Sequence, residues 1–243
     1  MISRCLLIAA LLGAPALAAP RVIPASDLLI RQTSANLTWR WRAPPETATQ
    51  PALLRQLRAT ALKDAAKAGA DAGRDAASAK KDGFPFRRYE FVTDWSLAAD
   101  TPNLLALSGL VYSFTGGAHG NTGYASKIWD KQAKRAISID ALFTDWPRAR
   151  RLIEPAFCRA LAEEQKRRIG NAGPDSACPK LAEQPIVPWG EFGARAPQLR
   201  VLLGPYVAGS YAEGSYLITL PWPQGVKSLV KPAYRNDLFA DNG

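Results

Sequence analysis

Residues 103–114 read NLLALSGLVYSF, and this stretch decides the fold. Its apolar side chains occupy both sets of alternating positions, so a strand formed here is apolar on both faces. Such a strand lies in the middle of a sheet and is covered on each side. The stretch therefore predicts a central strand with further layers packed on both faces of its sheet.

Most neighbouring segments alternate between apolar and polar residues, which is typical of strands with one buried face. In residues 37–42, for example, Leu37, Trp39 and Trp41 share a face. Because strands cluster between helices and do not alternate regularly with them, the pattern predicts an α+β fold with antiparallel sheets and packed helices. The other expected strands are 87–97, 123–130, 135–140, 198–207 and 214–222, and the expected helices are 51–79, 144–168 and a short one at 224–232.

Residues 1–18 have the features of a cleaved secretory signal. Arg4 supplies a positive start, residues 5–12 are apolar, and Ala16 and Ala18 have the small-x-small spacing of a signal peptidase site. The apolar core of this segment is too short to span a membrane. We therefore expect a periplasmic or secreted protein with no transmembrane segment after signal cleavage.

The composition indicates a folded, basic protein. The 243 residues are 47% hydrophobic, include seven tryptophans and carry a formal net charge of +10. This charge favours anionic partners, among which export makes nucleic acid the least suitable and peptidoglycan or another anionic envelope polymer more suitable. The same charge also fits an exported protein that has no dedicated anionic partner.

Signal cleavage would remove Cys5 and leave two cysteines, Cys158 and Cys178. Two cysteines in an oxidising compartment predict one disulfide. The chain-entropy model gives a loop of this length about 3 kcal/mol of stabilisation. A redox role is disfavoured because the two residues lack Cys-x-x-Cys spacing.

Residues 113–124, SFTGGAHGNTGY, contain four glycines and the only histidine of the chain. The segment joins two expected strands, so Gly116, Gly117 and Gly120 fit a wide hairpin connection. It lacks the Lys-Ser/Thr ending of a phosphate-binding loop and does not open a helix, which argues against a nucleotide site. One histidine beside two paired cysteines cannot supply a common zinc ligand set. We therefore expect neither a cofactor nor a metal.

His119 allows two interpretations. As a general base it would need a nucleophile, but none of the candidates Ser113, Ser126, Ser210 and Ser215 lies in a Gly-x-Ser-x-Gly elbow. No carboxylate pair for glycoside hydrolysis can be assigned either. Alternatively, the imidazole pins the glycine loop by hydrogen bonds to backbone groups. The second interpretation is favoured because only one member of a catalytic constellation is visible.

Two further segments resemble a known family. Residues 112–143 resemble the signature of the domain-of-unknown-function 3298 family: a strand, a Gly-Gly-Ala-His-Gly loop, a strand ending in aspartate, a basic turn and Asp-x-Leu-Phe. Residues 206–222 resemble its second, aromatic-rich signature. Residues from about 27 to 110 look like the companion domain that usually precedes it and also occurs in PdaC-type deacetylases.

The resemblance implies an α+β fold with a smaller N-terminal subdomain, residues 19–110, and a C-terminal subdomain, residues 111–243, likened to part of the Hsp70 ATPase fold. The family includes the extracellular part of the anti-sigma factor RsiV, which binds lysozyme, and no established catalytic residues carry over. This chain lacks the spanning helix of such a sensor and the metal-binding histidines of a polysaccharide deacetylase domain. Its positive charge would also repel cationic lysozyme at long range.

These features together favour a non-catalytic cell-envelope binding module for peptidoglycan, another anionic envelope polymer or an envelope protein. Two alternatives remain open: a small envelope hydrolase with His119 as general base, and an interaction protein resembling a lysozyme or protease inhibitor. Trp129 is expected either to contact the ligand or to pack in the core. The expected binding residues are Gly116, Gly117, His119, Gly120, Tyr211 and Tyr216.

Overall fold

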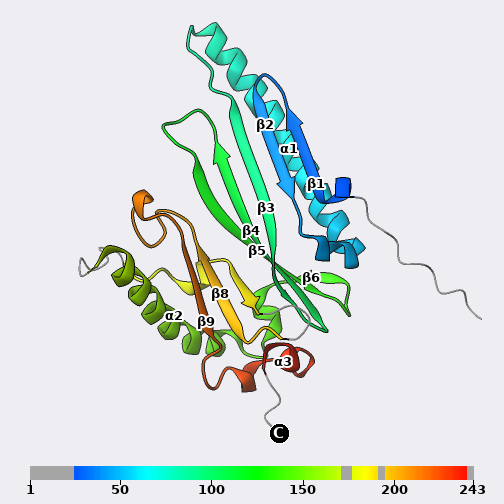
Figure 1. Ribbon diagram of the computed structural model, residues 1–243, viewed down its shortest axis with the longest axis vertical. Helices are drawn as coiled ribbons and strands as arrows, with labels where there is room; N and C mark the ends of the chain where they lie inside the picture. Colours follow the sequence, from blue (N-terminus) through cyan, green and yellow to red (C-terminus); the bar gives the residue numbers. More distant parts are fainter. Residues whose placement is uncertain (1–24, 171–176, 191–194, 240–243) are drawn as a thin grey trace, which may run out of the picture.

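The computed structural model describes residues 25–170, 177–190 and 195–239. These residues form a six-stranded sheet in the order β1-β2-β3-β4-β5-β6 and a three-stranded sheet in the order β7-β8-β9 (Figure 1). The expected signal peptide, residues 1–18, lies outside the described residues. The strands are β1 (Leu29–Thr33), β2 (Leu37–Arg42), β3 (Tyr89–Asp100), β4 (Leu104–Phe114), β5 (Asn121–Asp130), β6 (Arg135–Ile137), β7 (Ile186–Trp189), β8 (Gln198–Leu203) and β9 (Tyr216–Pro221).

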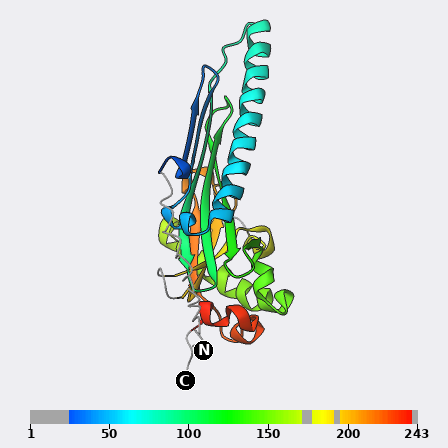
Figure 2. The same cartoon turned by 90° about the vertical axis from the view of Figure 1, so that its right-hand side faces the viewer.

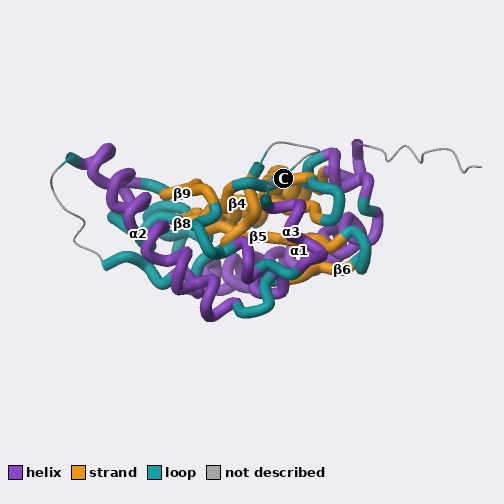
Figure 3. The backbone as a smooth tube through the Cα atoms, turned by 90° about the horizontal axis from the view of Figure 1, so that it is seen from below, coloured by secondary structure: helices purple, strands orange, loops and turns teal. Residues whose placement is uncertain are grey.

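Within the described residues, three α-helices accompany the sheets: α1 (Pro51–Lys81), α2 (Trp146–Ile169) and α3 (Pro232–Leu238). Figure 2 shows α1 running along one face of the larger sheet. Seen from below, α2 and the small sheet lie on one side of the view and β6 on the opposite side (Figure 3). None of the helices in the described ranges is both long and apolar enough to cross a membrane.

The predicted central strand is confirmed as β4, which pairs with β3 on one side and β5 on the other. Leu104 and Ala106 belong to a core cluster shared with α2 and the small sheet, whereas Leu105 and Leu107 belong to a second cluster shared with the first turns of α1. All four side chains are fully buried. The two apolar faces of the sequence therefore correspond to two separate cores.

Among the strands that the structure describes, the antiparallel prediction is correct for every pair except one. β2 and β3 run parallel, with Leu37 opposite Tyr89 and Arg42 opposite Asp94. Parallel neighbours need a long crossover connection, and the 31-residue helix α1 supplies it. The mixed α+β class is thus confirmed, with one βαβ unit inside an otherwise antiparallel sheet.

Other differences concern boundaries and short elements. The expected boundary between residues 110 and 111 falls inside β4, so the larger sheet continues across it. Strand β7 lies where no strand was expected, and the expected helix at 224–232 is a single 3-10 turn, Lys227–Leu229, followed by α3. The predicted disulfide between Cys158 and Cys178 is confirmed.

Candidate ligand-binding site

The glycine-rich loop connects β4 to β5 as a hairpin, as expected. Gly116 has φ +92°, a left-handed conformation that favours glycine. Gly120 is buried against Tyr112, and a Cβ atom at this position would lie 2.2 Å from the Tyr112 hydroxyl oxygen. Arg87 donates a hydrogen bond of 2.7 Å to the Gly117 carbonyl. The loop is therefore fixed by close backbone packing and by a side chain from the start of the neighbouring strand.

His119 is exposed at this loop and is pinned in the way that the sequence suggested. Its Nδ1 lies 2.9 Å from the carbonyl oxygen of Gly120, an acceptor, so this bond requires the proton on Nδ1. The same carbonyl accepts a 3.0 Å hydrogen bond from the Tyr211 hydroxyl. The His119 and Tyr211 rings stack with centroids 4.1 Å apart.

A third ring, Tyr206, completes the cluster. Its hydroxyl lies 3.5 Å from His119 Nε2, and its ring centroid is 5.4 Å from that of Tyr211. Tyr206 is 62% exposed and Tyr211 38% exposed. We call His119, Tyr206 and Tyr211 the aromatic platform. Tyr206 was not among the expected binding residues, because residues 198–207 read as one strand; β8 ends at Leu203, just before the Gly204-Pro205 turn signal.

The segment that carries the two tyrosines docks directly on the hairpin. A Cβ at Gly204 would lie 2.7 Å from the Thr122 carbonyl oxygen, so only glycine allows this approach of backbone to backbone. Tyr206 itself has φ +69°, a conformation that side-chain-bearing residues adopt rarely. Backbone conformations of this kind concentrate at functional sites.

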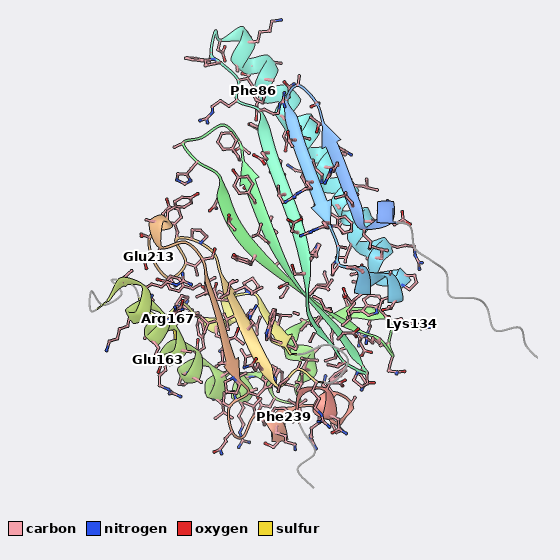
Figure 4. The ribbon with its side chains drawn as sticks, in the orientation of Figure 1. Phe86, Lys134, Glu163, Arg167, Glu213 and Phe239 are labelled. Atoms are coloured by element: carbon pink, nitrogen blue, oxygen red, sulfur yellow. A yellow bond between two sulfur atoms is a disulfide. The ribbon has the colours of Figure 1, made fainter. Side chains whose placement is uncertain are left out.

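Side chains of helix α2 form hydrogen bonds to the segment that carries Tyr206 and Tyr211. Gln165 donates a buried 2.6 Å hydrogen bond to the Ala208 carbonyl. Arg168 donates to the carbonyls of Glu213 and Ser215 at 3.2 and 2.8 Å. Figure 4 shows Glu213 on this loop next to the end of α2 that carries Arg167. The platform is thus held between the hairpin and the C-terminal end of α2.

Glu213 organises the turn between Tyr211 and β9. One carboxylate oxygen accepts from the Ser210 backbone N–H at 2.7 Å, and the other accepts from the Tyr216 hydroxyl at 2.6 Å. The Tyr216 bond, followed by the Ser210 bonds, lowers the pKa of Glu213. Burial and the Glu213 carboxylate raise the pKa of Tyr216 to about 12. The pair therefore stays as carboxylate and phenol at neutral pH.

Two aromatic residues proposed from the sequence lie away from the platform surface. Tyr216 is fully buried, with Arg168 stacked 4.2 Å over its ring, so its ring has no free face for a ligand. Trp129 is 1% exposed and packs in the core shared with α1. Tyr216 supports the platform from beneath, and Trp129 belongs to the core.

His119 has few polar partners. In the ranges that the structure describes, its hydrogen bonds go to Gly120 and Tyr206, neither of which is a serine or a carboxylate. Within the same ranges, no three His, Cys, Asp or Glu side chains are grouped in a way that could hold a metal ion. The chemistry visible at the platform is therefore that of ring stacking and hydroxyl hydrogen bonding.

Gly120→Ala is expected to disrupt this site. The added methyl group would overlap Tyr112, and overpacking of this kind costs about 1–3 kcal/mol. The displaced Gly120 carbonyl would also release His119 and Tyr211. Thermal unfolding measures the first effect, and the imidazole proton NMR signals, unique in this chain, report the second. Gly117→Ala is the matched control because a Cβ there meets no atom within 4 Å; equal behaviour of the two variants would contradict the packing argument.

Comparisons with known proteins agree with this architecture. Residues 41–122, about a third of the chain, match the family model of the deacetylase PdaC. No curated protein is significantly similar to the sequence. A solved domain-of-unknown-function 3298 protein from Bacteroides fragilis NCTC 9343 has a TM-score of 0.58 at 15% identity, covering 85% of this chain and 92% of that one. A second, from Pseudomonas aeruginosa PAO1, has a TM-score of 0.49 at 15% identity, covering 84% and 87%.

At this identity the likeness to the Bacteroides protein concerns the fold. The proposed likeness of the C-terminal part to the Hsp70 ATPase fold remains a prediction. The shared fold and the PdaC match, which spans α1 and the glycine-histidine hairpin, together confirm the resemblance to the domain-of-unknown-function 3298 family predicted from the sequence.

Proposed function

We propose that the protein is a non-catalytic binding module of the cell envelope and that it recognises a glycan, with peptidoglycan as the first candidate. The observation that supports this proposal is the exposed, preorganised aromatic platform of His119, Tyr206 and Tyr211. Rings that are fixed before a ligand arrives lose little conformational entropy on binding.

The chemistry of the platform suits a sugar ring. A pyranose has an apolar face, which can lie on an aromatic ring, and a rim of hydroxyl groups, which needs hydrogen-bond partners. Tyrosine offers both an apolar ring and a hydroxyl group. The 62% exposure of Tyr206 leaves most of that side chain available for such a contact.

Binding is favoured over hydrolysis because of the surroundings of His119. A hydrolase that uses His119 as general base would need a serine or a carboxylate within hydrogen-bond reach of the imidazole. The hydrogen bonds of His119 go instead to Gly120 and Tyr206, and they hold the imidazole in place as one of the three rings of the aromatic platform. We further propose export to the periplasm or outside the cell, on the basis of the signal-like residues 1–18 and the disulfide.

Co-sedimentation with insoluble peptidoglycan tests the proposal. Wild-type protein is expected to sediment with the polymer, and Tyr206→Ala is expected to weaken binding by up to about tenfold, the value of one good aromatic contact. Adding His119→Ala should weaken binding further. Phe84→Ala is the matched control, because Phe84 is also an exposed aromatic, 71% exposed, but follows α1.

Two results would overturn the proposal. One is no retention of the wild-type protein at low salt, and the other is equal retention of wild type and the double variant. If the wild-type protein releases soluble fragments from the polymer and His119→Ala does not, the hydrolase alternative is correct instead.

A further inference from the structure

The outer face of α2 is strongly basic. Its inner face packs in the core through Ile153, Phe157 and Leu161. The residues that recur at spacings of three and four on the opposite side are all exposed. This outer face extends over about 30 Å of helix. It consists of Arg148, Arg151, Leu152, Pro155, Arg159, Ala162, Lys166 and Ile169.

Ion pairs within the described ranges leave the four cations on this face unpaired. No carboxylate in the described parts of the chain forms an ion pair with any of these four side chains, which are Arg148, Arg151, Arg159 and Lys166. The ion pairs of α2 lie beside the face, where Glu164 binds Arg167 and Arg168. Asp145 and Glu163 flank the face, and Glu154 accepts a hydrogen bond from the Leu181 backbone N–H beside it, so the face keeps a net positive charge.

Apolar side chains lie between these cations. Leu152 is 39% exposed and Ile169 is 36% exposed, and Pro155 and Ala162 lie between them along the helix. A hydrated polyanion would neutralise the cations but would give these apolar side chains no environment to enter. A lipid headgroup region offers both, because it carries phosphates at its surface and acyl chains beneath.

We propose that the outer face of α2 binds the surface of a bilayer that contains anionic phospholipids. The four cations contact the phosphates, and Leu152 and Ile169 enter the headgroup region. This surface is separate from the aromatic platform, which is supported by Gln165 and Arg168 on the inner side of the same helix. A membrane-bound α2 would therefore leave the platform free to bind its ligand.

Vesicle co-sedimentation tests this proposal. The protein is expected to bind vesicles of phosphatidylglycerol mixed with phosphatidylcholine, and not phosphatidylcholine alone, with affinity falling as salt is raised. Because each basic side chain near an anionic surface contributes substantially, Arg151→Glu/Arg159→Glu should weaken binding by at least tenfold. Leu152→Ser should weaken it a few-fold without any change of charge.

The control variant is Arg55→Glu/Lys63→Glu on α1, which changes the net charge equally at two other exposed cations. It should retain most of the binding, and thermal unfolding should show that all variants are folded. Equal loss in the two double variants would mean that only net charge matters and would overturn the proposal. Undiminished binding of Leu152→Ser to the vesicles would also overturn the proposal. So would a wild-type protein that does not bind the vesicles but loses peptidoglycan binding when Arg151 and Arg159 are replaced. If the proposed glycan binding at the aromatic platform is wrong, the peptidoglycan retention assay alone will show it, and vesicle binding will be unchanged.

Discussion

Trp129→Ala should lower the free energy of unfolding by about 3–5 kcal/mol, the usual cost of truncating a buried aromatic residue to alanine. Trp129 lies on β5 opposite Leu105 of β4 and Ala136 of β6, and it is 1% exposed. Its indole N–H donates a 3.2 Å hydrogen bond to Gln50, the residue that precedes α1. Truncation would therefore leave a cavity between the sheet and α1 and an unpaired amide at the helix start.

Thermal unfolding should show this loss as a fall in Tm on the order of 10 °C. Trp129→Phe, which keeps most of the packing but removes the N–H donor, should cost less. Below the unfolding temperature, Trp129→Ala should bind peptidoglycan as the wild-type protein does. A variant that keeps its Tm but loses the ligand would place Trp129 in the binding site and contradict the core assignment.

Local sequence patterns predicted the elements of this fold well. Alternation located β2, the two apolar faces of residues 103–114 located β4, and helical spacing located α1 and α2, because at least one face of each element is buried along much of its length. Pairing direction was harder, since the crossover that makes β2 and β3 parallel depends on where α1 packs. The seven-residue helix α3 was missed because tertiary contacts, such as the partly buried hydrogen bonds from Asn103 to Asp237, hold it in place.

The candidate site, like the fold, could be predicted from the sequence only in part. The glycines and His119 were recognised because glycine loops and a single histidine are visible in the sequence itself. Which tyrosines join them could not be read from the chain, since the sequence does not say which side of a loop faces solvent. Tyr216 begins a strand whose first side chain points into the core, whereas Tyr206 follows a turn that points it outward.

The two loops form one site because each fixes the other. The Gly120 carbonyl orients both His119 and Tyr211, and the Gly204 backbone rests on Thr122 at the base of the hairpin. Neither loop alone would hold three rings in place. Residues 87 and 91 positions apart in the sequence therefore act together, and a search for local motifs cannot detect such pairs.

Reducing the disulfide is expected to cost about 3 kcal/mol, because the bond between Cys158 and Cys178 closes a loop with a sequence separation of 20. Tm should fall by about 6–12 °C in a domain of this size. Cys178 is exposed, so dithiothreitol can reach the bond without prior unfolding. Cys158→Ser/Cys178→Ser should show the same fall and should not respond further to the reductant.

The aromatic platform should survive this change below the unfolding temperature. Cys158 lies in the middle of α2, whereas the contacts that hold the platform come from Gln165 and Arg168 at its end. The His119 NMR signals of the reduced protein should therefore match those of the oxidised protein. An unchanged Tm after verified reduction would contradict the expected stabilisation by the disulfide, whereas shifted His119 signals would mean that the disulfide also positions the site.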